Sequence, residues 1–183
     1  KLLLQSVNLY KSNFLYDSGF KKILNNFEFK NIYKKFRTIL FLEICKEAFL
    51  FCKSEVQKQG KIDFDYMILK TIEIINDLKN YKYKYVLVDE FQDISWTRLK
   101  FLKKILEHGN SKIFAVGDDW QSIYRFAGSD VNVFLNFAEE FEDVKINKIS
   151  ITYRNSQEMQ TIMQKFILKT KPKIEKTLKS SLH

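Results

Sequence analysis

The sequence predicts an α/β fold in which a parallel sheet is flanked by helices and preceded by a helical subdomain. After Gly60, short apolar runs alternate with segments of helical periodicity, which is typical of the βαβ units that build parallel sheets. Before Gly60, apolar residues recur near helical spacing. This first part of the chain is therefore expected to be helical.

The helical subdomain is expected within residues 1–60. Residues 1–30 are predicted to form short helices with a break at residues 17–19, and residues 31–59 to form one long amphipathic helix that ends before Gly60. The apolar positions that define the long helix are Ile32, Phe36, Ile39, Leu40, Ile44, Phe51, Cys52 and Val56.

A helix, a strand and a second helix are expected next. Asp63 or Asp65 can cap the first helix. Residues 85–88 form a continuous apolar run, which predicts a strand covered on both faces, as in parallel sheets. Ser95 can cap the second helix, and Gly109 is expected to end it.

Two further strands with their helices complete the predicted sheet. Residues 113–116 and 146–151 are the expected second and third strands. Asp130 can cap the helix between them. Asn155 and Glu158 have the spacing of a capping box and are expected to open the last helix.

Length and composition suit one domain or one and a half. A chain of 183 residues can bury roughly 70% of its unfolded surface, and no apolar run reaches the length of a membrane span. Cys45 and Cys52 lie on the expected long helix, where a rise of about 10 Å excludes a disulfide between them. Free thiols fit a reducing cytoplasm. The only histidines, His108 and His183, form no metal-ligand cluster.

The net charge of +9 is unevenly distributed along the chain. Residues 1–84 carry a net +7, residues 85–154 a net −2 and residues 155–183 a net +4. Basic flanks of this kind can neutralise nucleic-acid phosphates. The alternative is a lysine-rich composition without a binding role, because Lys outnumbers Arg 27 to 4.

Two carboxylates, Asp89 and Glu90, follow the first strand directly. Ligands bind beyond the carboxyl ends of parallel strands. There, one carboxylate can hold Mg²⁺ while its neighbour polarises a water for attack on a phosphate. For this pair considered alone, a solvated turn is the alternative.

Polar residues also follow the other two strands. Within residues 117–128, a glycine turn and two acids precede Gln121, whose amide can contact a phosphate or an attacking water. After the third strand, the ring of Tyr153 can stack on a base, and the guanidinium of Arg154 can fork onto a phosphate.

Aromatic residues surround Arg125 in the same segment. Tyr124 and Phe126 share a face of an extended chain and can stack on unpaired bases at about 1–3 kcal/mol each. Trp120 and Arg125 complete this candidate nucleic-acid surface. A place in the core is the alternative for Tyr124 and Phe126.

Four segments resemble the motifs of superfamily 1 DNA helicases of the UvrD/Rep group, namely IDFDYMI, LVDEFQD, FAVGDDWQSIYRFAGSD and ITYRNSQEM. They occur in the family's order, and the resemblance covers roughly residues 61–170. The sequence VGDDWQSIYRF is most similar to the corresponding motif of the helicase IV branch. The resemblance implies an incomplete RecA-like (P-loop NTPase) sheet, ATP and Mg²⁺ as cofactors, and single-stranded or partially duplex DNA as partner.

The resemblance also implies roles for the candidate ATP-site residues. Asp89, with Glu90 beside it, would coordinate Mg²⁺, and Glu90 would be the base that activates water. Gln121 would contact the γ-phosphate and couple it to the DNA site. Tyr153 would stack on the adenine, and Arg154 would act as a γ-phosphate finger.

At the DNA site, the resemblance implies stacking of Tyr124 and Phe126 on single-stranded bases. Two positions depart from the commoner family pattern. Phe126 stands where Trp is usual, and Ala127 stands where many relatives carry Arg.

A P-loop of the form G-x-x-x-x-G-K-[ST] is missing from the sequence. The one Gly-Lys pair, Gly60-Lys61, is followed by Ile62, and Glu55 stands at the upstream glycine position. The chain is therefore expected to be an internal fragment that also lacks the family's C-terminal motifs.

The resemblance divides this fragment into three parts. Residues 1–60 would be a helical insertion in the first motor domain, residues 61–152 the later part of that domain, and residues 153–183 the start of the second.

The main functional hypothesis is an ATP-dependent DNA helicase or translocase of 3′-to-5′ polarity, of which this fragment alone is catalytically silent. The alternative is a non-hydrolysing, helicase-like module that binds single-stranded nucleic acid or a protein partner such as RNA polymerase. No membrane partner is expected in either case.

Overall fold

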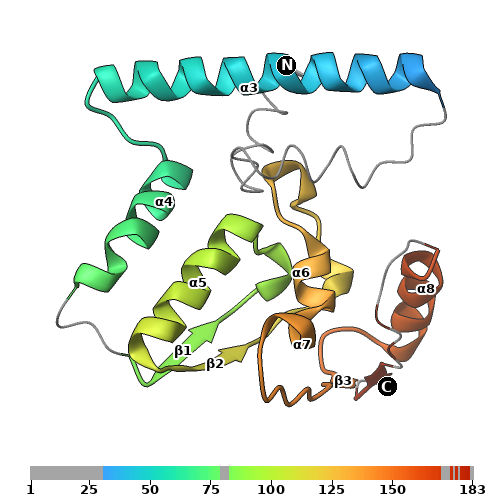
Figure 1. The fold of residues 1–183 in the computed structure, drawn as a ribbon. Helices are drawn as coiled ribbons and strands as arrows, with labels where there is room; N and C mark the ends of the chain where they lie inside the picture. The colour runs from blue at the N-terminus through green and yellow to red at the C-terminus, as the bar shows by residue number, and fades with distance from the viewer. Residues whose placement is uncertain (1–30, 79–82, 170–173, 175, 177, 182–183) are drawn as a thin grey trace.

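The computed structural model describes residues 31–78, 83–169, 174, 176 and 178–181. Its helices and strands alternate after the first two helices, and both of its small sheets are parallel (Figure 1). A mixed α/β fold is thereby confirmed. The short helices expected within residues 1–30 lie outside the described residues.

Helix α3, Ile32–Lys58, has the extent that the sequence predicts and ends before Gly60. The side chain of Asn31 caps it by accepting a hydrogen bond of 2.8 Å from the backbone N–H of Lys34. The expected apolar stripe was wrong, since none of its eight positions is buried and the buried residues are Cys45 and Phe49. Apolar side chains are spread around this helix rather than gathered on one side.

Cys45 is buried and Cys52 is exposed, and both lie on α3. The two cysteines form no disulfide with each other in this structure.

Helix α4, Phe64–Ile74, packs against the later helix α5, Trp96–Gly109. The side chain of Asp63 caps α4 through a hydrogen bond of 2.7 Å from the N–H of Tyr66, which decides between the two predicted caps. Ser95 caps α5 as predicted, accepting from the N–H of Arg98 at 3.3 Å. The left-handed residue that follows α5 is Asn110.

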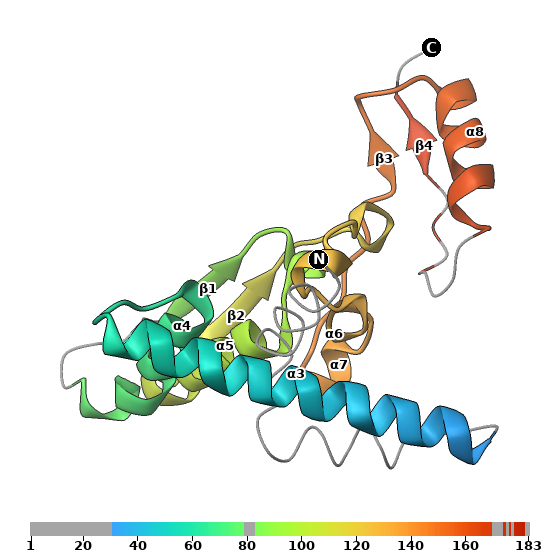
Figure 2. The same cartoon turned by 90° about the horizontal axis from the view of Figure 1, so that it is seen from above.

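The central sheet pairs β1, Tyr85–Val88, with β2, Lys112–Ala115 (Figure 2). The strands are parallel, with Val86 opposite Ile113 and Val88 opposite Ala115. These four side chains pack against the buried core. The core residues are Phe91, Ile94, Leu99, Leu102 and Val133.

The opposite face of this sheet is open, so the expectation of a strand covered on both faces was wrong for the described residues. Leu87 in β1 is 75% exposed, and its partner in register, Phe114 in β2, is 62% exposed. Burial therefore alternates along both strands, because only one face meets α5 and the core.

The helix expected after Asp130 is divided in two. Asp130 caps α6, Val131–Leu135, as predicted, and α7, Phe137–Glu140, follows after a break at Asn136. Short 3₁₀ turns follow α4 and the two central strands. η1, Ile75–Asp77, comes directly after α4, η2, Phe91–Asp93, follows β1, and η3, Asp119–Gln121, and η4, Arg125–Ala127, follow β2.

The third strand differs from its prediction in length and in partner. β3 comprises only Ile151–Thr152 and pairs in parallel with β4, Lys179–Ser180, in a second sheet. Helix α8, Gln157–Ile167, packs beside this sheet. Ser156 caps α8 by accepting from the N–H of Met159, so the cap predicted at Asn155 was one residue too early.

No helix of the described residues combines the length and the apolar composition needed to cross a membrane.

Candidate functional site

The two carboxylates that follow β1 are both exposed. Glu90 lies in the left-handed region at φ 51° and ψ 42°, a conformation that is uncommon for residues other than glycine and asparagine. One oxygen of Asp89 accepts a hydrogen bond of 2.9 Å from the Glu90 N–H. This sharp turn places both side chains where the sheet ends.

Gln92 joins the ends of the two central strands. Its side chain is buried, with 1% of the residue exposed. Its Nε2 donates to Oε2 of Glu90 at 2.7 Å, and its Oε1 accepts from the N–H of Asp118 at 2.9 Å. One planar amide thus fixes the Glu90 carboxylate relative to the turn after β2.

Gly117 makes this close approach possible. A Cβ atom at this position would lie 2.7 Å from Oε1 of Gln92 and 2.7 Å from a ring carbon of Phe134. Both distances are below van der Waals contact, so a side chain here would displace the bridging amide.

The turn after β2 continues the network toward Gln121. Oδ2 of Asp118 accepts from Nε2 of Gln121 at 2.9 Å, and Oδ1 of Asp118 accepts from the N–H of Trp120 at 3.0 Å. An unbroken series of contacts therefore connects Glu90, Gln92, Asp118 and Gln121.

Lys176 reaches the same turn from the C-terminal part of the chain. Its ammonium group forms ion pairs with Asp118 and with Asp119, whose side chain is fully buried. Burial alone would raise the pKa of Asp118, but hydrogen bonds from Lys176, Gln121 and the Trp120 backbone, with the Lys176 charge, hold this pKa below its usual range.

Backbone contacts reinforce this ion pair. The N–H of Ile174 donates to Oδ2 of Asp119 at 2.7 Å, and the indole N–H of Trp120 donates to the Ile174 carbonyl at 3.2 Å. The Lys176 ammonium also lies 5.2 Å from the centre of the Trp120 ring. Trp120 is half-buried by these contacts. It therefore offers less ring surface for stacking on a base than the exposed Tyr124 and Phe126 do.

A cavity of about 550 Å³ lies beside the acidic pair, between α4, β1 and α5. Asp93 and Arg98 contribute to its lining together with apolar residues. Burial raises the pKa of Asp93, the charge of Glu90 raises it further, and Arg98 opposes both effects.

Tyr124 and Phe126 form an exposed aromatic pair. Their ring centres lie 6.0 Å apart, and the two residues are 48% and 70% exposed. Arg125 between them is also exposed. The alternative of two core residues is excluded by this exposure.

Tyr153 and Arg154 follow β3 and are exposed. Since β3 belongs to the second sheet, they lie apart from the hydrogen-bonded network at the first. Within the described residues, no hydrogen bond or ion pair connects them with Asp89, Glu90 or Gln121.

The donor set at the end of β1 fits a magnesium ion that is shared with a phosphate ligand. Mg²⁺ is usually held by one or two carboxylates together with waters and substrate phosphates. Asp89 is exposed and uses one oxygen for the Glu90 N–H, which leaves the other for a cation. A site built from protein alone is not found, because no group of three or more His, Cys, Asp or Glu side chains among the described residues could hold a metal.

The sequence reasoning missed two residues of this network. Gln92 carries a signal, since it stands within LVDEFQD directly after the acidic pair. Lys176 carries none, because it is one of 27 lysines and its role depends on a contact with residues more than fifty positions earlier.

The chain is similar in sequence to known DNA helicases. The family model of the UvrD/REP helicase N-terminal domain matches residues 15–142. DNA helicase IV of Escherichia coli is 32% identical over 130 residues, which cover 70% of this chain and 19% of that protein. The ATP-dependent DNA helicase PcrA of Bacillus subtilis is 25% identical over 63% of the chain and 16% of its own length. The ATP-dependent DNA helicase Rep of Buchnera aphidicola is 27% identical over 83% of the chain and 22% of its own length.

The matched part of this chain thus spans about a fifth of the length of these curated relatives.

Proposed function

This chain belongs to the UvrD/REP helicase family, and from that membership we propose that it supplies part of the ATPase centre of an ATP-dependent DNA helicase. The observation that carries the proposal is the bridge from Glu90 through Gln92 to the turn after β2. A solvated turn needs no buried amide to orient its acid. An acid that must take a proton from a particular water does need one.

In the proposed mechanism, Asp89 would hold Mg²⁺, which neutralises charge on the ATP phosphates when bound. Gln92 fixes Oε2 of Glu90, which leaves Oε1 to accept the proton of the attacking water. Gln121 would contact the γ-phosphate, and its link to Asp118 would set its orientation.

The remaining contacts would come from the exposed residues. Tyr153 would stack on the adenine, and Arg154 would reach the γ-phosphate when the second sheet closes toward the first. Tyr124 and Phe126 would stack on single-stranded bases, with Arg125 and Trp120 beside them.

The wider organisation belongs to the same proposal. Residues 61–152 would be the later part of a first RecA-like motor domain with residues 1–60 as its helical insertion, and residues 153–183 would begin the second. The complete helicase would move 3′ to 5′ on single-stranded or partially duplex DNA. A cytoplasmic location is part of the same proposal, because Cys45 and Cys52 form no disulfide with each other.

The test of the ATP site uses a polypeptide that contains this chain together with a P-loop. Glu90→Gln should remove ATP hydrolysis and leave ATP binding intact, because the amide preserves shape but cannot take a proton. Glu107→Gln, at an exposed acid of α5, is the control and should hydrolyse ATP as the unmodified protein does. Unchanged turnover in Glu90→Gln would refute the assignment of the base. The 183-residue chain alone should not turn over ATP.

The test of the DNA site titrates the 183-residue chain with single-stranded oligonucleotide at several salt concentrations. Binding should weaken as salt rises, because each neutralised phosphate releases counterions. Tyr124→Ala together with Phe126→Ala should weaken binding at every salt concentration. Binding by the chain without any hydrolysis in the P-loop-containing polypeptide would favour a non-hydrolysing module instead.

A further inference from the structure

We propose that Lys176 is a positioning residue that holds Gln121 in place through their shared partner, Asp118. The proposal builds on the proposed role of Gln121 as a phosphate contact. It adds a residue from the C-terminal part of the chain to the control of that contact.

The two side chains bind opposite oxygens of one carboxylate. Oδ2 of Asp118 accepts from Gln121 at 2.9 Å, while Oδ1 accepts from the ammonium of Lys176. A carboxylate held at both oxygens cannot rotate freely, so the Lys176 contact fixes the plane in which Asp118 receives the Gln121 amide. Without Lys176, Oδ1 of Asp118 would keep the Trp120 N–H and lose its charged donor.

Burial makes this ion pair costly to break. The side chain of Lys176 is 19% exposed, and that of its second partner, Asp119, is 0% exposed. A buried carboxylate without a countercharge is strongly disfavoured, and among the described residues Lys176 is the cation paired with Asp119. Loss of the Lys176 contact would leave the buried Asp119 carboxylate without this countercharge, so the contact is favoured.

Three hydrogen bonds hold Ile174 and Lys176 in place. Ile174 donates to Asp119 and accepts from Trp120, and the Lys176 carbonyl accepts from Nε2 of Gln164 in α8 at 2.9 Å. Residues 174 and 176 thus contact the turn after β2 on one side and α8 on the other.

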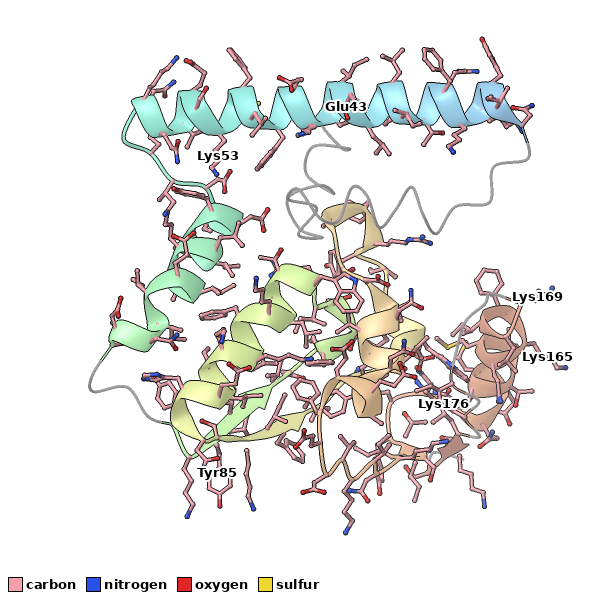
Figure 3. The ribbon with its side chains drawn as sticks, in the orientation of Figure 1. Glu43, Lys53, Tyr85, Lys165, Lys169 and Lys176 are labelled. Atoms are coloured by element: carbon pink, nitrogen blue, oxygen red, sulfur yellow. The ribbon has the colours of Figure 1, made fainter. Side chains whose placement is uncertain are left out.

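This arrangement places Gln121 under the control of the unit formed by β3, α8 and β4. Figure 3 shows Lys176 on the side of α8 that faces α6 and α7, whereas Lys165 and Lys169 point away from α6 and α7. Displacement of the C-terminal unit would withdraw the ammonium from Asp118. The Asp118 carboxylate would then be held less firmly at Oδ1, so the orientation of Gln121 would depend on where that unit lies.

The test observes the side-chain amide of Gln121 by NMR in the ¹⁵N-labelled 183-residue chain, with Gln121→Met assigning the signal. In Lys176→Met, the Gln121 amide signals should shift toward those of a free glutamine side chain. Lys176→Arg keeps the charge and should retain the signals. Lys165→Met removes an exposed lysine of α8 and should leave them unchanged.

An unshifted Gln121 amide in a folded Lys176→Met chain would overturn the proposal, as would the same shift in Lys165→Met. Circular dichroism establishes folding. If Lys176→Met does not fold, the same Gln121 signals are measured in Lys176→Gln. This variant removes the charge but keeps an amide that can donate to one aspartate, and its Gln121 signals should also shift toward those of a free side chain. The experiment contains no nucleotide. Failure of the Lys176 contact would therefore be separate from failure of the proposed ATP site, which is measured by turnover of Glu90→Gln.

Discussion

The side-chain amide of Gln92 donates to Oε2 of Glu90 at 2.7 Å and, through its oxygen, accepts from the N–H of Asp118 at 2.9 Å. Because the amide is planar and buried, its two contacts cannot be adjusted independently. The orientation of the acidic residue after β1 is therefore tied to the turn after β2.

Gln92→Met is expected to lower the free energy of unfolding by about 1–3 kcal/mol. The substitution keeps the volume but leaves the part-buried N–H of Asp118 without its acceptor, and unsatisfied buried polar groups cost about this much. Urea denaturation of the 183-residue chain measures the change.

Gln59→Met is the matched control for this substitution. Gln59 is exposed, and among the described residues its side chain accepts a hydrogen bond from Lys61 alone, so the free energy of unfolding should change by less than about 0.5 kcal/mol. Equal losses in the two variants would show that the Gln92 bridge contributes nothing specific to stability.

Gly117→Ala should destabilise the chain by about 1–3 kcal/mol through overpacking. The added methyl group would lie 2.7 Å from both Gln92 Oε1 and the Phe134 ring, and the bridging amide would have to move. Gly60→Asn is the control, since nothing lies within 4 Å of a Cβ at that position and asparagine tolerates its φ of +63°. A Gly117→Ala chain as stable as the unmodified one would contradict the close approach.

Local sequence signals predicted the elements that position this site. The apolar run 85–88 predicted β1, and the cap at Ser95 predicted the start of α5, because both depend on neighbouring residues. The prediction of the third strand was wrong because that strand depends on distant residues. β3 exists through its pairing with β4, which lies almost thirty residues further along the chain, and local periodicity contains no information about that pairing.

In the candidate site too, local signals predicted some residues, whereas a long-range contact was missed. Asp89, Glu90 and Gln121 stand at strand ends where a parallel sheet gathers polar residues, so sequence position alone predicted that they would lie near one another. The role of Lys176 arises only when the chain folds back onto Asp118 and Asp119.

Acidification should release the contacts that Asp118 makes with Lys176 and with the Trp120 backbone. The pKa of Asp118 is lowered from its ordinary 3.8 in the folded chain. Its charge therefore stabilises the fold above pH 3.8, and this stabilisation is lost as the pH falls through the lower, folded-state pKa.

The NMR signal of the Trp120 indole N–H, which donates to the Ile174 carbonyl, reports this release. Its shift should change between pH 3.8 and lower values, and in Asp118→Asn it should already be altered at pH 7. A Trp120 signal that is unaffected in Asp118→Asn would contradict the stabilising role of the carboxylate.

The open face of the central sheet predicts self-association of the 183-residue chain. Leu87 and Phe114 are partners in register and are 75% and 62% exposed, and parallel sheets are ordinarily covered on both faces. Contact between two such faces would bury apolar surface, and each Å² buried stabilises the contact by roughly 25 cal/mol.

Sedimentation velocity at increasing concentration should therefore detect association. Leu87→Lys and Phe114→Lys should each weaken it, whereas Ile149→Lys, at a residue 83% exposed outside both sheets, should not. A chain that stays monomeric at high concentration would show that this face needs no partner in water.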